Sequence, residues 1–326
     1  MAEAYYSLAG PVLKVASDSA QLLDRIDRHL RALRLAAGAP ETFRLSLRHG
    51  TPGDLPPVAK IYYRGEIAGE GSCIFGEDET ARYFLMPDRI SFVLDSLGDA
   101  GCLTVESGEE ARLSGTAFFH ALDAALVAGG QTLIHAAAAT LPDRRSAILI
   151  FAPSGTGKTT ASLALLRGGY GVFSDDTAVI RKDGGHHQVW GVPRAFKVHR
   201  QTAGLFPWLN GYLTGTWDAH DEQPLSMDSA AKLGRIEGAQ PCKVAAVIRL
   251  NGRGGGEHAL RRLSKNEALV SLSADNLRTG AGGMPQFMQS RFGVLAGLIQ
   301  EAATFELTTG DDMEGLGAYL GDRIAA

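Results

Sequence analysis

Cysteine is scarce in this sequence, and long apolar runs are missing. The three cysteines, Cys73, Cys102 and Cys242, lie too far apart to form a metal-ligand cluster, and their odd number does not make a full disulfide set. No stretch reaches the roughly 18 apolar residues of a membrane span, and the first residues lack the basic and apolar segments of a secretory signal. These absences predict a soluble, cytoplasmic protein with reduced thiols and no membrane partner.

An excess of positive charge is missing as well. The 32 Lys and Arg residues are outnumbered by 36 Asp and Glu, which gives a formal net charge of −4. Nucleic-acid binding needs clustered cations that meet the phosphate backbone, so this composition predicts no nucleic-acid partner. The composition is otherwise that of an ordinary globular protein. With 326 residues, 45% of them apolar, the chain has room for one large domain or two smaller ones.

The sequence pattern divides the chain into two predicted domains. Residues 1–115 combine short strand-like segments with one helical pattern, which indicates a small α/β module. Its helix is expected to start at a cap formed by Ser17 or Asp18 and to extend to about Ala37. Residues 116–326 open with an apolar helix pattern and form the predicted second domain.

The second domain contains further hairpin and helix patterns. Apolar runs of strand length joined by short polar or glycine-rich turns are typical of paired strands. Ser264 and Glu267 have the spacing of a capping box, which opens a helix. The predicted hairpins cover residues 131–153, 177–192 and 243–264; the predicted helices cover 114–128, 264–272, 290–303 and 313–324, with a strand at 305–308.

The stretch APSGTGKT fits the P-loop pattern, except that Ala152 stands where glycine is usual. Gly155 and Gly157 permit backbone conformations that point successive N–H groups at phosphate oxygens. Lys158 provides a positive charge for the β- and γ-phosphates, and the Thr159 hydroxyl is a magnesium ligand. The strand pattern before the loop and the helix pattern after it are the expected context. The residues expected to bind the phosphates of ATP are Ser154, Gly155, Thr156, Gly157, Lys158, Thr159 and Thr160.

A second apolar strand, YGVFS, ends in two adjacent aspartates, Asp175 and Asp176, 17 residues after Lys158. Neighbouring carboxylates are costly in an apolar setting unless a cation lies nearby, and magnesium at the P-loop is such a cation. One carboxylate then faces the metal and the other faces an incoming hydroxyl, which it orients or deprotonates. The alternative is a surface turn with two solvated aspartates; the adjacent P-loop favours a functional pair. For His135, on the strand LIHAAAA, a core position and a site position are equally supported.

The run HAAAA followed by FAPSGTGKTTASLALLRGGYGVFSDD resembles the C-terminal kinase domain of HPr kinase/phosphorylase and its HPr-kinase-like relatives. The same superfamily includes the P-loop phosphoenolpyruvate carboxykinases. The resemblance is good over residues 118–180 and extends by element order over residues 116–326. It implies an α/β P-loop kinase domain with a mixed sheet and helices, and it suggests a homo-oligomer.

The resemblance also implies roles for the residues of this run. Asp175 is the implied general base, Asp176 and Thr159 serve the magnesium, and His135 lies beside the transferred phosphate. Lys158, which holds the phosphates, completes the expected catalytic set with Asp175 and His135.

One part of the family pattern is absent. HPr kinases carry a Glu-x-Arg-Gly signature after the aspartate strand, whereas this chain has Gln188 and Trp190 in place of the glutamate and arginine, and only Gly191 is kept. A neutral amide is a weaker ligand for a hard cation than a carboxylate. The departure favours an HPr-kinase-like paralogue over HPr kinase itself.

Several other residues have two interpretations. Arg194, Lys197 and Arg200 follow the predicted hairpin at residues 177–192, and Arg291 begins a late helix. These cations either stabilise transition-state charge and hold an acidic acceptor segment or are solvated surface groups.

For two more patterns, a structural role is favoured over a binding site. The stretch GRGGG, residues 252–256, lacks the lysine of a phosphate loop and reads as a hairpin loop. His186 and His187 have no third ligand in view and read as a polar turn.

Together these patterns predict an ATP- and magnesium-dependent serine kinase. The expected acceptor is a hydroxyl of a protein or of a ribosomally made precursor peptide, such as a lasso-peptide precursor, an expectation that depends on family analogy alone. A small-molecule kinase on the same scaffold and a non-catalytic ATP-sensing module remain alternatives. A carboxykinase is disfavoured because no additional lysine and histidine metal ligands are in evidence.

Overall fold

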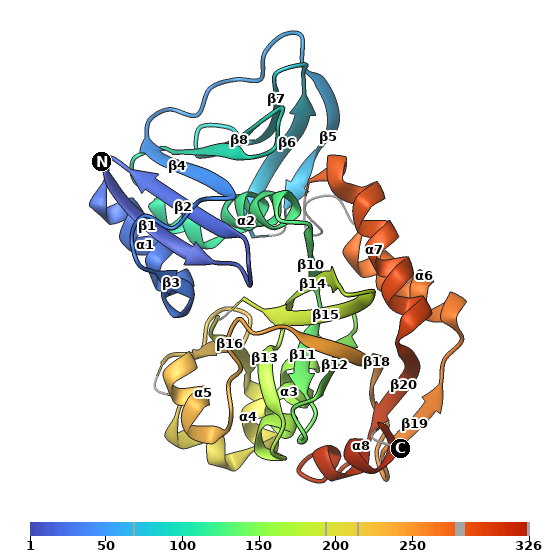
Figure 1. Cartoon of the computed structure of the whole chain (residues 1–326). Coiled ribbons are helices and arrows are strands. Elements are labelled where there is room, and N and C mark those ends of the chain that lie inside the picture. Colours follow the sequence, from blue (N-terminus) through green and yellow to red (C-terminus); the bar gives the residue numbers. More distant parts are fainter. Residues whose placement is uncertain (68, 193, 214, 278–283, 325–326) are drawn as a thin grey trace. The chain divides into compact units, whose positions relative to one another are not determined.

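The computed structural model describes residues 1–67, 69–192, 194–213, 215–277 and 284–324. The chain has a mixed α/β fold with two large mixed sheets and helices (Figure 1). It divides into two compact units: the first contains residues 1–133 and 276–292, and the second contains residues 134–275 and 293–326. Among the described residues, no helix combines the length and apolar character that a membrane crossing requires. All three cysteines are free thiols, as expected.

The first unit is built on a nine-stranded sheet of order β3-β1-β2-β4-β9-β8-β7-β6-β5. Its central pairs β2–β4 and β4–β9 are parallel, and its outer pairs are antiparallel. The elements are β1 (Ala2–Ser7), β2 (Val12–Ser17), α1 (Ala20–Leu30), η1 (Arg31–Leu33), β3 (Arg34–Leu35), β4 (Phe43–His49), β5 (Lys60–Ile67), β6 (Gly71–Glu77), β7 (Ala81–Met86), β8 (Ile90–Asp95), β9 (Ala100–Val105), η2 (Glu110–Ser114), α2 (Thr116–Ala128) and, from the later segment, η4 (Pro285–Phe287).

The second unit contains a sheet of order β10-β14-β15-β18-β12-β11-β13, to which β20 adds by pairing with β18 and β19. A separate two-stranded sheet joins β16 and β17. The elements are β10 (Gln131–His135), β11 (Ala137–Thr140), β12 (Ser146–Phe151), α3 (Lys158–Arg167), β13 (Gly171–Ser174), β14 (Thr177–Asp183), β15 (His186–Gly191), β16 (Phe196–His199), α4 (Arg200–Leu205), η3 (Pro207–Gly211), β17 (Glu222–Leu225), α5 (Met227–Leu233), β18 (Cys242–Arg253), β19 (Ala259–Arg262), α6 (Lys265–Asn276), α7 (Met288–Glu301), β20 (Ala303–Thr309) and α8 (Leu316–Ile324).

The division between the units differs from the expected boundary after residue 115. Helix α2 packs on β4, β8 and β9 of the first sheet, so it belongs with the first unit. The helix is apolar on nearly all sides, as its burial requires. Its sequence pattern therefore does not indicate which sheet the helix packs against. Residues 276–292 return to the first unit from much later in the chain, where Arg291 pairs with Asp123 of α2.

Helix α1 starts later and ends earlier than expected. Ser17 belongs to β2, and the cap is Ser19, whose Oγ accepts a hydrogen bond from the Leu22 amide. The helix ends at Leu30 because the following segment turns and pairs Arg34 and the next residue with β1. The prediction of a helix to about residue 37 was therefore wrong: a strand pairing overrides the helical periodicity.

Two of the three predicted hairpins are confirmed. Strand β11 pairs antiparallel with β12, and β14 pairs antiparallel with β15. The third prediction was wrong, because β18 and β19 do not pair with each other. Strand β20 lies between them, parallel to β18 and antiparallel to β19. The helix after β19 does open with the predicted capping box, in which the Ser264 and Glu267 side chains bond reciprocally to backbone amides.

The core of the second unit positions the predicted phosphate loop. Helix α3 packs on β11 and β13, as Figure 1 shows. The buried side chains of this layer include Leu163 and Leu165 of α3 and Ile148 and Ile150 of β12. Because this apolar layer fixes the end of β12 and the start of α3, the loop between them has a defined position.

Candidate functional site

The predicted phosphate loop lies between a strand and a helix, as expected. Strand β12 leads into the loop, and α3 begins at Lys158. Gly155 and Gly157 have φ angles of +80° and +107°, which glycine adopts at no steric cost. Ala152, in place of the usual glycine, is buried in the core and does not have a positive φ. Its methyl group therefore packs without backbone strain, which explains why the substitution is tolerated.

Lys158 is a buried cation at the start of α3. Its side chain is 6% exposed, and its Nζ donates a hydrogen bond to the carbonyl oxygen of Ala152 at 2.8 Å. Burial lowers the pKa of the amine, while the carboxylates of Asp176 and Asp175 act in the opposite direction. The amine thus lies beside the loop whose amides are expected to face phosphate oxygens.

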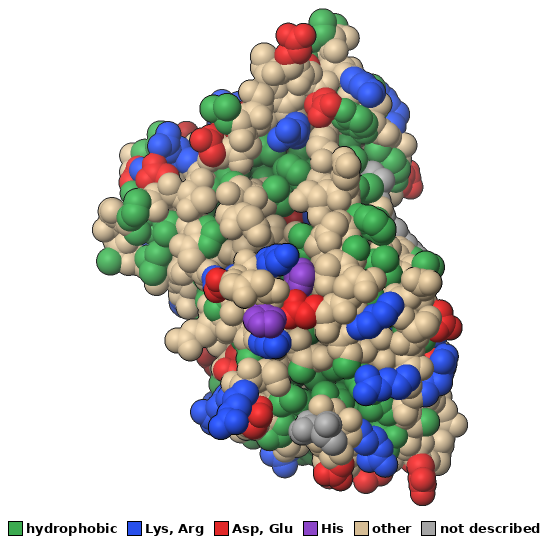
Figure 2. Space-filling view, turned by 45° about the vertical axis from the view of Figure 1, so that its right-hand side comes forward, with side chains coloured by type: hydrophobic (Ala, Val, Ile, Leu, Met, Phe, Trp, Pro, Cys, Tyr) green, Lys and Arg blue, Asp and Glu red, His purple; other side chains and the backbone are tan. Residues whose placement is uncertain are grey.

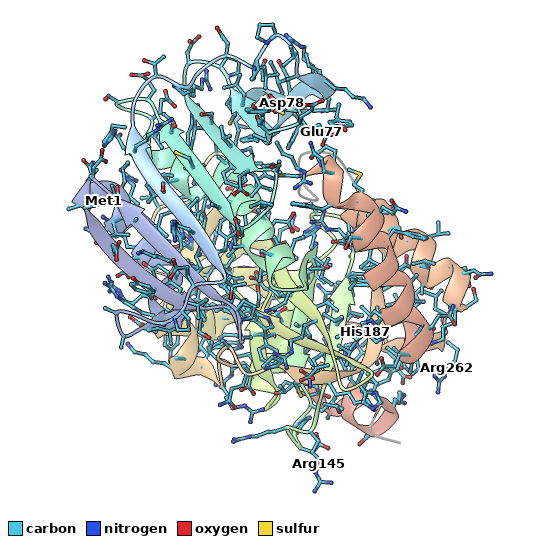
Figure 3. The ribbon with its side chains drawn as sticks, turned by 45° about the horizontal axis from the view of Figure 1, so that its top comes forward. Met1, Glu77, Asp78, Arg145, His187 and Arg262 are labelled. Carbon is cyan, nitrogen blue, oxygen red and sulfur yellow. The ribbon has the colours of Figure 1, made fainter. Side chains whose placement is uncertain are left out.

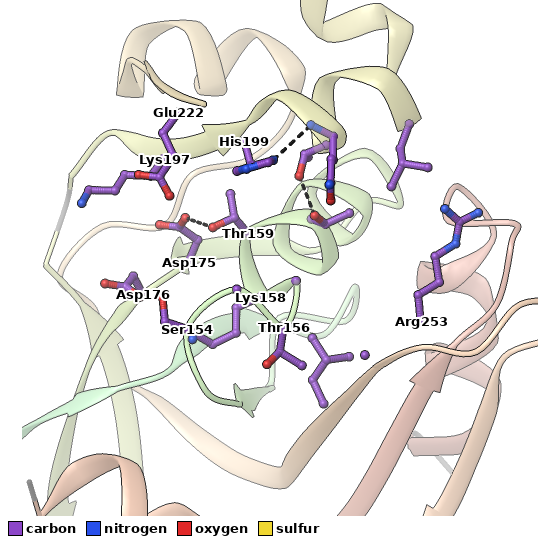
Figure 4. Close-up of a pocket in the computed structure, with 18 of the residues that line it drawn as sticks. Ser154, Thr156, Lys158, Thr159, Asp175, Asp176, Lys197, His199, Glu222 and Arg253 are labelled. Atoms are coloured by element: carbon purple, nitrogen blue, oxygen red, sulfur yellow. Dashed lines mark hydrogen bonds between the residues drawn. The ribbon is translucent and has the colours of Figure 1, made fainter. Parts of the chain in front are cut away.

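The two aspartates at the end of β13 have different partners. Asp175 is 2% exposed, and its Oδ2 accepts a hydrogen bond from the Thr159 hydroxyl at 2.6 Å (Figure 4). Burial raises the pKa of Asp175 to about 6. Asp176 is 45% exposed at its side chain, lies 2.9 Å from Nε2 of His135, and has Nη1 of Arg194 at 3.8 Å. Burial acts to raise the pKa of Asp176, but the His135 hydrogen bond and the nearby positive charges hold it at about 2.

These partners put Thr159 beside Asp175, whereas the resemblance had grouped Thr159 with Asp176. His135 is the last residue of β10. The strand that pairs with β12 is β11, which begins only after Ala136, so His135 does not belong to the strand beside β12. His135 nevertheless reaches the aspartates through Asp176. The His135 side chain is 29% exposed and lines the cavity, so it is not a core side chain, and its role in the site stays a prediction.

These residues line one cavity of about 820 Å³ in the second unit. All of the predicted site residues are among its lining: His135, Ser154, Gly155, Thr156, Gly157, Lys158, Thr159, Thr160, Asp175 and Asp176. Of the four candidate cations, Arg194 and Lys197 line it as well. Figure 2 shows one face of the molecule on which histidine, acidic and basic side chains lie close together.

The other two candidate cations lie outside the described lining. Arg200 donates to Asp221 and covers the ring of Trp217. Arg291 is buried in the first unit, where its Nη2 donates to both carboxylate oxygens of Asp123 at 2.6 and 2.7 Å. Both arginines therefore have roles that do not involve the cavity.

The histidine pair and the altered family signature also lie elsewhere. His186 and His187 both contact the carboxylate of Glu301 on α7, and Figure 3 labels His187 next to this helix. Gln188 accepts a hydrogen bond from Arg181, and Trp190 is fully buried. Neither Gln188 nor Trp190 lines the cavity. These two residues of β15 therefore contribute no metal ligand to the described site.

Sequence reasoning missed several cavity residues. One signal was available: the alternation in FKVH places Lys197 and His199 on the same side of β16, away from the buried Phe196 and Val198. His199 is the cross-strand partner of Glu222. The missed lining residues are Ala195, His199, Gln201, Thr202, Leu205, Glu222, Leu250, Gly252, Arg253, Thr309 and Met313.

Comparisons with known proteins give little further information. No protein-family model matches the chain, and no curated protein matches it. Among solved structures, it is similar to the Hpr(Ser) kinase/phosphatase from Coxiella burnetii, with 19% identity and a TM-score of 0.23. That match covers 36% of this chain and 64% of the other, so it spans less than two thirds of the relative. A TM-score this low does not establish a common fold, and the function proposed below depends on the cavity residues.

Proposed function

We propose that this chain is an ATP-dependent kinase that transfers the γ-phosphoryl group to a hydroxyl group. The observation that carries the proposal is the hydrogen bond from Thr159, the hydroxyl that follows the P-loop lysine, to the buried Asp175 at 2.6 Å. In P-loop enzymes a Ser or Thr at this position and a strand-end aspartate share the magnesium ion. A second carboxylate beside this pair is what transfer to a hydroxyl requires, and Asp176 is in that position.

The residues present fit a magnesium ion. Magnesium takes oxygen ligands and is usually held by one or two carboxylates together with substrate phosphates. The Thr159 hydroxyl and the Asp175 carboxylate are hard oxygen donors in contact with each other. A carboxylate that is 2% exposed and whose pKa is raised to about 6 lacks sufficient positive charge around it. A cation at this position, by favouring the ionised form, removes that penalty.

This arrangement favours the reverse of the roles that the resemblance implied. Asp175, beside Thr159, is assigned to the metal. Asp176, beside His135 and Arg194, is assigned to the acceptor hydroxyl. Its low pKa, about 2, keeps Asp176 ionised and able to accept a hydrogen bond from the hydroxyl. Phosphoryl transfer depends mainly on positioning and charge stabilisation rather than on a strong base, so a weakly basic carboxylate suits this role.

Bound Mg²⁺·ATP supplies the phosphoryl group and neutralises charge that develops on it. The residues of this chain do the rest. The loop amides and Lys158 bind the phosphates, His135 fixes Asp176, and Arg194 lies beside the position where transfer occurs.

The proposed acceptor is a serine of a protein or of a ribosomally made precursor peptide, as the sequence resemblance implies. Transfer of label from γ-labelled ATP to a panel of serine peptides and small alcohols tests the proposal. Label on a peptide and its loss in Asp176→Asn support a peptide kinase, and label on a small alcohol alone supports the small-molecule alternative. Tight binding of ATP with no label on any acceptor supports an ATP sensor and contradicts the kinase assignment.

A further inference from the structure

The C-terminal end of β18 reaches the phosphate-loop cavity. Gly252 lines this cavity with a φ of +85°, and a Cβ there would lie 4.0 Å from Cγ2 of Thr156. Leu250 also lines it, and its Cδ2 lies 3.9 Å from the position of a Cβ on Gly157. The end of β18 therefore contacts Thr156 and Gly157, the loop residues directly before Lys158. The aspartates lie elsewhere, next to Thr159.

Arg253 is held at the edge of this part of the cavity. Its Nη2 donates to Oδ1 of Asp311 at 3.0 Å, and Oδ2 of Asp311 accepts from the Gly256 amide at 2.8 Å. One carboxylate thus fixes both the Arg253 guanidinium and the turn that follows this strand end. The Arg253 side chain is 43% exposed and is part of the cavity lining. Figure 4 shows Arg253 on the opposite side from Asp175 and Asp176.

The large apolar side chains of the lining are Leu205, Leu250 and Met313. Leu205 comes from α4, and α4 is tied to the phosphate loop because the hydroxyls of Thr202 and Thr160 are hydrogen-bonded at 2.7 Å. Apolar surface with a few placed polar groups is the usual lining of a small-molecule pocket, and 820 Å³ lies within the volume range of such pockets.

The phosphate loop sets the direction in which a nucleotide enters this cavity. The lysine of a P-loop reaches the β- and γ-phosphates, while the loop amides cradle the α- and β-phosphates. The terminal phosphate therefore lies near Lys158 and the aspartates, and the nucleoside extends away from them. Leu250 and Gly252 contact the loop residues whose amides are expected to face the phosphates, and Arg253 lies on the side of the cavity away from the aspartates (Figure 4).

We infer that Arg253, together with Leu205, Leu250 and Met313, forms the subsite for the purine nucleoside, with the guanidinium stacked on the base. A guanidinium stacks on aromatic faces and contributes a cation–π attraction. Asp311 acts as a positioning residue for Arg253. This inference rests on the proposed function, because it takes the occupant of the phosphate loop to be a nucleoside triphosphate.

Calorimetric titrations with Mg²⁺·ATP and with Mg²⁺·tripolyphosphate test the subsite. The second ligand has the phosphates but no nucleoside. For Arg253→Ala we expect ATP to bind about tenfold more weakly and tripolyphosphate to bind within about twofold of wild type. Arg253→Lys keeps the charge and loses the planar group, so it restores only part of the ATP affinity.

Lys197→Ala is the matched control, because it removes one positive charge from the lining near the aspartates (Figure 4). It is expected to change the affinity for both ligands by similar factors. An equal effect of Arg253→Ala on both ligands, or no effect on either, overturns the nucleoside subsite. A wild-type protein that binds neither ligand overturns the proposed function itself, so the two failures are distinguishable. Unchanged thermal unfolding of the variants shows that the fold is retained.

Discussion

The two units of this chain bury charged side chains in different ways. In the second unit, Lys158 and Asp175 are almost fully buried, yet both line a cavity of about 820 Å³. In the first unit, Arg291 is 2% exposed and Asp123 is 0% exposed, and the guanidinium donates to both carboxylate oxygens. The first pair of charges faces space that a ligand can fill, whereas the second pair is packed against protein.

The difference shows that burial of charge does not by itself identify a functional site. Arg291 was a candidate for stabilising transition-state charge, but the structure assigns its Nη2 to Asp123. Its neighbour on α2, His120, is buried against Phe75 and Phe84. Burial and the charge of Arg291 lower the pKa of His120 to about 3, so it stays neutral. We therefore expect the buried pair of Arg291 and Asp123 to determine stability and the charges that line the cavity to determine activity.

The largest effect is expected for Lys158→Ala. The substitution removes the cation that meets the β- and γ-phosphates, and loss of a preorganised charge at a transferring phosphoryl group costs about 10³-fold or more in rate. Stability should change little, because within the described part of the chain the amine makes one hydrogen bond, to Ala152. Label transfer from ATP and urea unfolding measure the two properties. A normal rate of transfer in this variant contradicts the P-loop assignment.

The buried pair of the first unit should show the opposite pattern. Asp123→Asn leaves the Arg291 guanidinium buried with a neutral partner, and breaking a buried ion pair costs about 3–5 kcal/mol. Its matched control is Asp24→Asn, which breaks the exposed pair with Arg28 and should cost less than about 1 kcal/mol. Urea unfolding measures both. Where the variant is folded, its ATP affinity should match wild type; a specific loss of ATP binding would place the pair in the functional site.

Substitutions of the two cavity aspartates should have different effects. We expect Asp176→Asn to lower transfer about 10²-fold, as loss of a group acting on the hydroxyl does, while the Mg²⁺ concentration needed for ATP binding stays the same. Asp175→Asn should raise that Mg²⁺ concentration, because it removes a metal ligand. Titrations of ATP binding against Mg²⁺ distinguish the two roles. The reverse result restores the assignment implied by the sequence resemblance.

A smaller effect is expected at a third charged group, away from both sites. Burial acts to raise the pKa of Glu301, but hydrogen bonds from His187 and His186 lower it to about 2. Because the folded pKa lies below the unfolded value of about 4.5, this carboxylate stabilises the fold above pH 4.5. The stabilisation is lost as the pH falls towards 2. Between pH 5 and 2.5, Glu301→Gln should lose less stability than wild type, by on the order of 2 kcal/mol. If wild type and Glu301→Gln lose the same amount of stability over this pH range, the linkage is refuted.

Much of the candidate site was predictable because its signals are local. The predicted phosphate loop, the helix start at Lys158 and the aspartates after β13 lie within 26 residues, from Phe151 to Asp176. Within such a stretch, residue type and strand or helix period determine the geometry. The glycine positions and the strand before the loop were predicted for the same reason.

The remaining cavity residues were not predictable in this way. Arg253 and Met313 are about 95 and 155 residues after Lys158, and they reach the cavity only because β18 and β20 pair in the sheet. That pairing was missed, because adjacent apolar runs around GRGGG had suggested a hairpin. The return of residues 276–292 to the first unit, through Arg291, was missed for the same reason. Long-range pairings leave little trace in local patterns.

The most direct test of the account is a titration of the wild-type protein with ATP, with and without Mg²⁺. The cavity of the second unit is assigned to nucleotide phosphates and a magnesium ion, so we predict saturable binding at one site per chain. We expect Mg²⁺ to strengthen this binding at least tenfold, since Thr159 and Asp175 are the proposed ligands. An absence of ATP binding, or ATP binding that Mg²⁺ does not affect, contradicts the assignment.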